Sequence, residues 1–190
     1  AQDPHRAPYP PHGNAKTGGR NAPGDARSQG RFVTFYDDLL ARLSDSDVEY
    51  IVVGGVAATA HGSTRLTLDL DVLYSRTPEN LERIVKALHG LNPYLRGAPA
   101  GLPFRWDSRT LQSGLNFTLT TDRGDLDLLG VIAGVGSYSE ALAESVEMDA
   151  FGRPLKCLSL EQLLRAKRAA GRPKDLEVIA ELEEIRDGEL

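Results

Sequence analysis

The segment 50–74 constrains the fold of this chain more than any other, because two apolar runs in it frame a pair of glycines and an Asp-x-Asp motif. The first run, 50–53, is rich in β-branched residues and ends at Gly54-Gly55, which is typical of a buried strand that stops at a turn. The Ala-rich stretch 56–61 then predicts a helix of one to two turns. Glycines at such a strand-to-helix turn let backbone amides approach a phosphate group.

The second apolar run carries two carboxylates, and we expect it to form a strand over residues 68–74. Because side chains alternate along a strand, Asp69 and Asp71 should share one face, roughly 6 to 7 Å apart at Cα. Leu68 and Leu70 should then point to the opposite face. Two carboxylates on one face beside a phosphate-binding turn predict a divalent-metal site.

Composition and charge bound the class of protein. The chain has 190 residues and a formal net charge of −5, and we expect one domain over residues 31–190. Residues 1–30 are rich in Pro, Gly and Asn and nearly free of aliphatic side chains, which predicts a flexible tail. Since this tail holds four basic and two acidic residues, residues 31–190 carry −7. A domain that acidic lacks the usual electrostatic footprint of a nucleic-acid binder.

Residues 1–30 contain no apolar h-region, so we expect no signal peptide there. We also expect no membrane span, because no later apolar run approaches the roughly 18 residues that a span requires. Cys157 is the single cysteine, which excludes a disulfide framework and a cysteine zinc cluster. We therefore expect a cytoplasmic protein without a membrane partner.

Local signals outline the remaining secondary structure. Thr77 and Pro78 are typical of a helix start, and Ser159 with Gln162 matches a capping box. These elements predict an α+β fold, in which a mixed β-sheet is flanked by helices and followed by C-terminal helices. We expect helices over 31–43, 78–89, 159–170 and from 173 onward, hairpins over 115–129 and 146–158, and a long loop over 91–113.

The first hairpin offers a third carboxylate. If its second strand, 125–129, lies beside the strand 68–74, the spacing of roughly 4.8 Å between neighbouring strands brings Asp127 to the first pair. Asp127 lies among leucines inside the strand, whereas Asp125 is next to the turn and is more simply explained as solvated. We therefore favour Asp127 as the third metal ligand.

Four motifs stand out along the chain: Gly54-Gly55, the string Arg65-x-Thr67-x-Asp69-Leu-Asp71, the sequence GDLDLLG around Asp127, and KRAAGRPKD over 167–175. Together they resemble the nucleotidyltransferase superfamily with the DNA polymerase β-like palm, over roughly residues 31–186. Within it the chain resembles the small bacterial proteins akin to AbiEii, the toxins of type IV toxin–antitoxin pairs. The resemblance implies a nucleotidyltransferase-like fold and an enzyme that transfers a nucleoside monophosphate from NTP, for example ATP, to an acceptor hydroxyl.

The resemblance also implies roles at the phosphate and metal positions. Gly54 and Gly55 contact the triphosphate of the substrate. Asp69 and Asp71 bind two Mg²⁺ ions, and Asp127 is a ligand of the metal nearer the attacking hydroxyl. Such a pair of metals supports in-line attack at the α-phosphorus with release of pyrophosphate.

Cationic and hydroxyl side chains complete the expected site. Lys167 and Arg172 are candidates to reach the transferred phosphoryl group, and a motif of the related toxins maps onto Lys167 and Asp175. Many superfamily members have Gly-Ser at the first motif, so Ser63 is the candidate to supply the missing hydroxyl. Arg65 is a second candidate contact to the nucleotide. Ordinary helix-end chemistry also explains the stretch from Lys167 to Asp175, and Arg65 could instead pair with one of the carboxylates.

Three functions remain open at this point. The leading hypothesis is nucleotidyl transfer to a tRNA 3′ end or a protein hydroxyl, by the toxin of a pair with a cognate antitoxin. The second is a non-catalytic NTP-binding or toxin–antitoxin partner protein. The third is a small-molecule transferase like the aminoglycoside-modifying members, which a carboxylate-lined pocket in the loop 91–114 would support.

Overall fold

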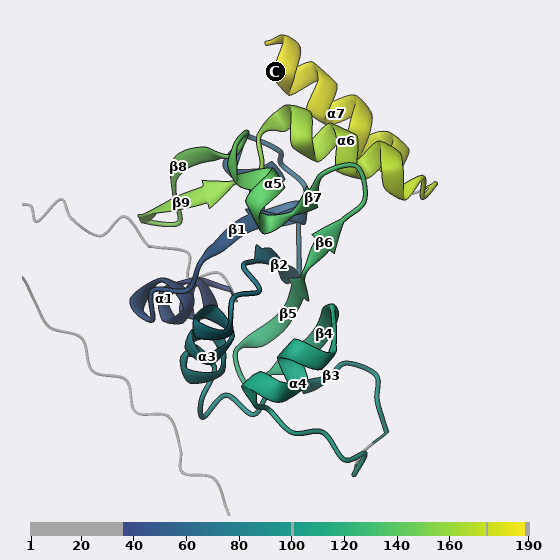
Figure 1. Ribbon diagram of the computed structural model, residues 1–190. Coiled ribbons are helices and arrows are strands. Elements are labelled where there is room, and N and C mark those ends of the chain that lie inside the picture. Colours follow the sequence, from purple (N-terminus) through teal and green to yellow (C-terminus); the bar gives the residue numbers. More distant parts are fainter. Residues whose placement is uncertain (1–35, 100, 174, 189–190) are drawn as a thin grey trace, which may run out of the picture. The chain divides into compact units, whose positions relative to one another are not determined.

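The computed structural model describes residues 36–99, 101–173 and 175–188, in which helices and strands alternate up to β4 (Asn116–Thr121) and hairpins and two C-terminal helices follow (Figure 1). The expected tail 1–30 and the first expected helical residues, 31–35, lie outside these ranges. The helices are α1 (Asp37–Asp45), α2 (Gly54–Ala60), α3 (Pro78–Ala87), α4 (Ser108–Ser113), α5 (Tyr138–Leu142), α6 (Leu160–Ala170) and α7 (Asp175–Asp187). The strands are β1 (Tyr50–Val53), β2 (Asp69–Tyr74), β3 (Tyr94–Leu95), β4 (Asn116–Thr121), β5 (Gly124–Leu129), β6 (Val131–Ile132), β7 (Gly136–Ser137), β8 (Val146–Ala150) and β9 (Arg153–Cys157).

Seven of the described strands form one mixed sheet in the order β3-β4-β5-β2-β1-β9-β8, and β6 pairs with β7 separately. Strand β2 runs antiparallel to β1 and parallel to β5, and β1 runs parallel to β9. The expected hairpins form as β4–β5 and β8–β9. The prediction of an α+β fold with a mixed sheet and C-terminal helices is therefore confirmed.

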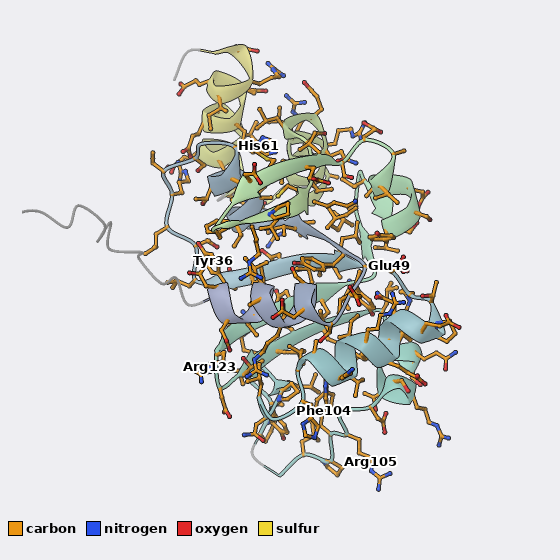
Figure 2. All side chains as sticks on the ribbon, turned by 90° about the vertical axis from the view of Figure 1, so that its left-hand side faces the viewer. Tyr36, Glu49, His61, Phe104, Arg105 and Arg123 are labelled. Carbon is orange, nitrogen blue, oxygen red and sulfur yellow. The ribbon has the colours of Figure 1, made fainter. Side chains whose placement is uncertain are left out.

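One face of the sheet is covered by α1 and α3, which contact each other and lie in front of the strands in Figure 2. Leu70 and Val72 of β2 are fully buried, as are Leu39 of α1 and Ile84 of α3. All four belong to one apolar core cluster. Because side chains alternate along β2, burying this face turns the side chains between them toward the opposite face.

Several boundaries differ from the expected ones. Leu68 precedes β2 and is 68 % exposed, because the pairing of β2 with β5 begins at Asp69. Helix α2 begins at Gly54 and α7 at Asp175, two residues before and after the expected starts. The expected loop 91–113 contains β3 and α4, and β6, β7 and α5 were not expected at all. Two-residue strands exist through their pairing and leave little periodicity in a sequence.

A buried amide joins α3 to the ends of β1 and β2. Asn80 is fully buried, and its Nδ2 donates to the carbonyl oxygens of Glu49 at 3.0 Å and Ser75 at 2.8 Å. Its Oδ1 accepts from the amide of Glu49 at 2.7 Å. The side chain thus makes three hydrogen bonds to the backbone beside these strands, and the one to Ser75 is fully buried.

We therefore predict that Asn80→Ala lowers the free energy of unfolding by about 2–4 kcal/mol, because it removes three hydrogen bonds made by a fully buried amide. Urea denaturation followed by circular dichroism measures this loss. Glu82→Ala, at an exposed position of the same helix, is the control and should change stability by less than about 0.5 kcal/mol. Equal effects of the two substitutions would contradict the assignment.

Candidate active site

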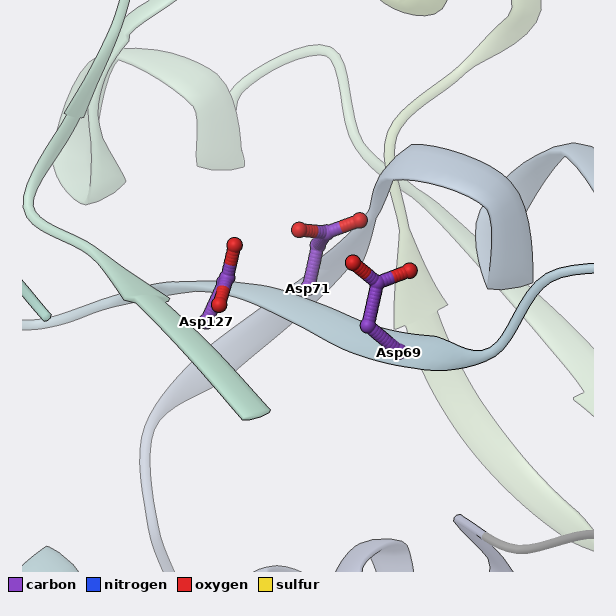
Figure 3. A group of neighbouring side chains, drawn as sticks. All are labelled: Asp69, Asp71 and Asp127. Atoms are coloured by element: carbon purple, nitrogen blue, oxygen red, sulfur yellow. The ribbon is translucent and has the colours of Figure 1, made fainter. Parts of the chain in front are cut away.

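Three carboxylates meet on the face of the sheet opposite α1 and α3. Asp69 and Asp71 lie on β2, and Asp127 lies on β5, directly paired with Asp71 in the parallel register. Their side chains point to the same side of the strands (Figure 3). One oxygen from each carboxylate lies within 4.8 Å of the others, a separation at which all three can bind one ion. The expected juxtaposition of Asp127 with the first pair is present.

The glycine pair is required by close approach of other chain segments. Val53 pairs with Asp71 across β1 and β2, so the chain turns at Gly54 directly beside that carboxylate. Gly54 has a φ of +61°, and a Cβ there would lie 2.0 Å from Oδ2 of Asp71. A Cβ on Gly55 would lie 2.5 Å from Oγ1 of Thr67. Glycine thus allows the turn and the metal-binding face to occupy adjacent space.

Bringing these carboxylates together is electrostatically unfavourable, and the effect is largest at Asp71. Burial, with the neighbouring charges of Asp69 and Asp127, raises the pKa of Asp71 to about 7, although Lys167 and Arg96 oppose the rise. Burial also raises the pKa of Asp127, and Arg96 opposes that rise as well. A cation placed among these oxygens would therefore be strongly favoured.

We predict that ionisation of Asp71 destabilises the metal-free protein as the pH rises from about 4 to about 7. The carboxyl group of Asp71 ionises near 3.8 when unperturbed and near 7 in the fold, so the folded state holds more protons in this window. Asp71→Asn removes the ionised group. It should raise the melting temperature by about 2–6 °C at pH 8 and by much less at pH 4.

Differential scanning calorimetry in EDTA measures both values. Asp149→Asn, at an exposed position of β8, is the control and should show no such pH dependence. A gain for Asp71→Asn that is the same at both pH values would contradict the role of ionisation.

Arg96 lies among the carboxylates, and the sequence analysis did not identify it. Its Nη2 donates a hydrogen bond to Oδ1 of Asp127. Its Nε lies 3.3 Å from Oδ2 of Asp125, and its Nη1 lies 3.6 Å from Oδ2 of Asp69. Asp125 is therefore an ion-pair partner of Arg96, outside the group of three. The pairing of β3 with β4 brings Arg96 here, and no local sequence pattern reports that pairing.

Glu181 of α7 fastens the loop between α2 and β2. Its Oε1 accepts from the hydroxyl of Ser63 at 2.9 Å and from the amide of Thr64 at 3.1 Å. Its Oε2 accepts from Nε of Arg65 at 2.6 Å, and Glu177 lies 3.3 Å from the same guanidinium. The alternative pairing of Arg65 with the carboxylates of β2 is thus wrong in this structure, because α7 supplies its partners.

We predict that Glu181→Ala loosens this loop. The loss of three hydrogen bonds should raise amide hydrogen exchange of the peptide 61–68 by roughly tenfold or more, because each bond contributes on the order of 1 kcal/mol. Exchange measured by mass spectrometry reports the change directly. Glu184→Ala, at an exposed position of the same helix, should leave exchange unaltered. Unchanged exchange in Glu181→Ala would show that the loop is held by other contacts.

A cationic wall is formed where α6 ends and α7 begins. Nζ of Lys167 lies 3.0 Å from Oδ1 of Asp175, which is nearly fully buried. Nε of Arg172 lies 3.3 Å from the other oxygen, Oδ2, without hydrogen-bond geometry. Gly171, in the left-handed conformation, ends α6 between these cations. Ordinary helix-end chemistry and a charged wall therefore coexist in this stretch.

The glycine turn, the three carboxylates and the cationic wall line one cleft with a volume of about 730 Å³. Apolar side chains of the loop before β2 and of β6 also line it, including Leu66 and Val131. The cleft brings together the residues that the sequence analysis assigned to the site: Gly54, Gly55, Ser63, Arg65, Asp69, Asp71, Asp127, Lys167, Arg172 and Asp175. Their chemical roles remain predictions.

The fold is similar to that of the antibiotic-resistance factor ANT(2'')-Ia, an aminoglycoside nucleotidyltransferase whose structure was solved in solution. The match has a TM-score of 0.50 and 19 % sequence identity, and it covers 81 % of this chain and 88 % of that chain. The predicted nucleotidyltransferase-like fold is therefore confirmed. No protein-family model and no curated protein sequence matches the chain. None of the helices in the described residues is long and apolar enough to cross a membrane.

Proposed function

We propose that this protein is a metal-dependent nucleotidyltransferase that moves a nucleoside monophosphate from an NTP to an acceptor hydroxyl. The observation that carries the proposal is the meeting of Asp69, Asp71 and Asp127 beside the glycine turn, in one cleft with Lys167. Carboxylates within reach of a single ion, next to space for a polyphosphate, suit phosphoryl transfer. Similarity to a nucleotidyltransferase fold supports the same reaction class.

The donor set fits Mg²⁺. The three carboxylates offer the oxygen ligands that this hard cation prefers, and burial with the neighbouring carboxylates raises the pKa of Asp71, so a cation there would be favoured. Asp69, Asp71 and Asp127 would hold the metal, and we propose a pair of ions. When bound, such ions lower the pKa of an acceptor hydroxyl and neutralise the triphosphate.

The chain's own residues orient the reacting groups. Gly54 and Gly55 would leave their backbone open to the triphosphate, while Lys167 and Arg172 would face its charge from the other wall of the cleft. The acceptor oxygen then attacks the α-phosphorus, the bond to the β-phosphate bridging oxygen breaks, and pyrophosphate leaves. The hydroxyl proton passes to solvent or to a carboxylate on the Asp127 side. Ser63 donates to Glu181, so a phosphate contact by its hydroxyl would need that bond to be exchanged.

The acceptor proposals follow from two different supports. The resemblance in sequence motifs favours a tRNA 3′ end or a protein hydroxyl, with the protein acting as a toxin that a cognate antitoxin controls. The fold similarity to ANT(2'')-Ia favours a small antibiotic-type acceptor. Among the described residues between 91 and 114, none lines the cleft, so the cleft does not contain the carboxylate-lined pocket in that loop that would support a small-molecule acceptor.

We predict that α-³²P-labelled NTP and Mg²⁺ give labelled product when the protein is incubated with a panel of cellular RNA, proteins and aminoglycosides. Asp69→Asn and Asp127→Asn should each lower the transfer rate by more than about 100-fold, because each removes a direct metal ligand. Asp149→Asn, on an exposed strand position, should retain the rate.

Pyrophosphate release measured in parallel, with calorimetric titration of NTP, separates catalysis from binding. Binding of NTP without pyrophosphate release across the whole panel would replace the proposal with the non-catalytic, NTP-binding alternative. Transfer that survives both carboxylate substitutions would remove the metal mechanism.

A further inference from the structure

Arg96 reaches the acidic cluster from the edge of the sheet at which β3 lies. Its backbone amide donates to the carbonyl of Thr118 at 2.9 Å, which fixes the start of the side chain just after β3. The guanidinium then approaches three carboxylates, at Asp69, Asp125 and Asp127. It thus contacts two of the three groups that could bind a metal.

The guanidinium is held mainly by charge. Its Nε is buried and makes no hydrogen bond, although it lies 3.3 Å from Oδ2 of Asp125. The Nη1 group is 3.6 Å from Oδ2 of Asp69, which is beyond hydrogen-bond distance. The bond from Nη2 to Asp127 is the single hydrogen bond that its side chain makes to these carboxylates. About 29 % of the side chain is exposed, so solvent can reach it.

Arg96 contacts oxygens of groups that could bind a metal ion. Oδ1 of Asp127 accepts a hydrogen bond from Nη2, and Oδ2 of Asp69 lies 3.6 Å from Nη1. A divalent cation bound by Asp69, Asp71 and Asp127 would lie beside this guanidinium, and the two cations would repel each other. The observed position of Arg96 therefore opposes metal binding.

We infer that Arg96 is an internal counter-ion on the metal-binding face of the sheet that competes with an incoming divalent cation for the same carboxylates. The inference rests on the metal site of the proposed function. Arg96 stabilises the metal-free protein by compensating the cluster, and by the same interaction it weakens metal affinity. Arg96 is a positioning residue for the resting site and takes no part in the chemical step.

Mn²⁺ binding followed by electron paramagnetic resonance of the free ion tests this inference on the full chain. Arg96→Gln should bind Mn²⁺ about tenfold more tightly than the wild type, since a cation near 4 Å in a wet site opposes binding by about 1.4 kcal/mol. It should also melt at a lower temperature in EDTA. Arg96→Lys, which keeps the charge, should lie between the two.

Arg123→Gln is the matched control, because Arg123 also pairs with an aspartate, Asp38 at 3.5 Å, and is exposed. It should leave Mn²⁺ affinity unchanged. A second measurement uses the wild-type protein. In its NMR spectrum the ¹⁵N–¹H signal of Arg96 Nε should shift when Mg²⁺ is added, and the absence of this signal in Arg96→Lys assigns it.

The outcomes separate the inference from the proposed function. Tighter binding by Arg96→Gln, or a shifted Nε signal, supports it. If Arg96→Gln binds Mn²⁺ no more tightly than the wild type and the Nε signal does not move, the inference is overturned. The metal site of the proposed function would still stand in that case, provided that the wild type binds Mn²⁺ and Asp69→Asn does not. No Mn²⁺ binding by either wild type or Arg96→Gln would overturn both.

Discussion

The pairing of β2 with a strand on each side sets the geometry on which the rest of the structure depends. Antiparallel pairing with β1 puts Val53 opposite Asp71, and parallel pairing with β5 puts Asp127 opposite it on the other side. The position after Val53 must then be glycine, because a Cβ there would overlap the carboxylate. A one-residue slip of either pairing would turn the aspartates toward the apolar core, where Leu70 and Val72 now lie.

The cost of gathering these charges is distributed over the whole cleft. On the sheet side, Arg96 compensates three carboxylates. On the helical side, Lys167 and Arg172 are themselves compensated by the buried Asp175. Both walls therefore contain internal ion pairs, while burial and the neighbouring carboxylates still raise the pKa of Asp71. Under the proposed function, a metal and a triphosphate would bind together by replacing internal pairs of both kinds, so neither ligand would leave an uncompensated wall.

Features with a local cause could be predicted from the sequence. Thr77 caps α3 and Ser159 caps α6 through side-chain hydrogen bonds that involve neighbouring residues alone, and both helices begin where the pattern indicated. The strands around Asp69 and Asp127 carry their own apolar runs, and their alternation put the carboxylates on the correct face. The apolar content of a buried strand and the caps of a helix are properties of a few consecutive residues.

Features that depend on tertiary contacts were missed. Arg96 stands in a stretch of prolines and glycines, and it reaches the carboxylates because β3 pairs with β4. The paired residues are far apart in sequence, so no local pattern predicts this contact. Pairing with the nearby carboxylates was one alternative for Arg65, but a helix more than 100 residues away supplies its partners. Helix α5 was also missed, but for a different reason: the capping box of Ser137 and Glu140 is a local signal that could have predicted it.

The contacts of α7 argue that the C-terminal helices belong to the site. Leu182 is fully buried and anchors α7, while one side of the same helix presents Glu181 to the loop that leads into β2. At its first turn, Asp175 holds Lys167 in the wall of the cleft. Oγ1 of Thr67, in that loop, lies 3.3 Å from a carboxylate oxygen of Asp69, so the loop connects α7 with the metal-binding strand through consecutive contacts. Any change that shifts α7 would therefore move the positions of both the cationic wall and the first carboxylate.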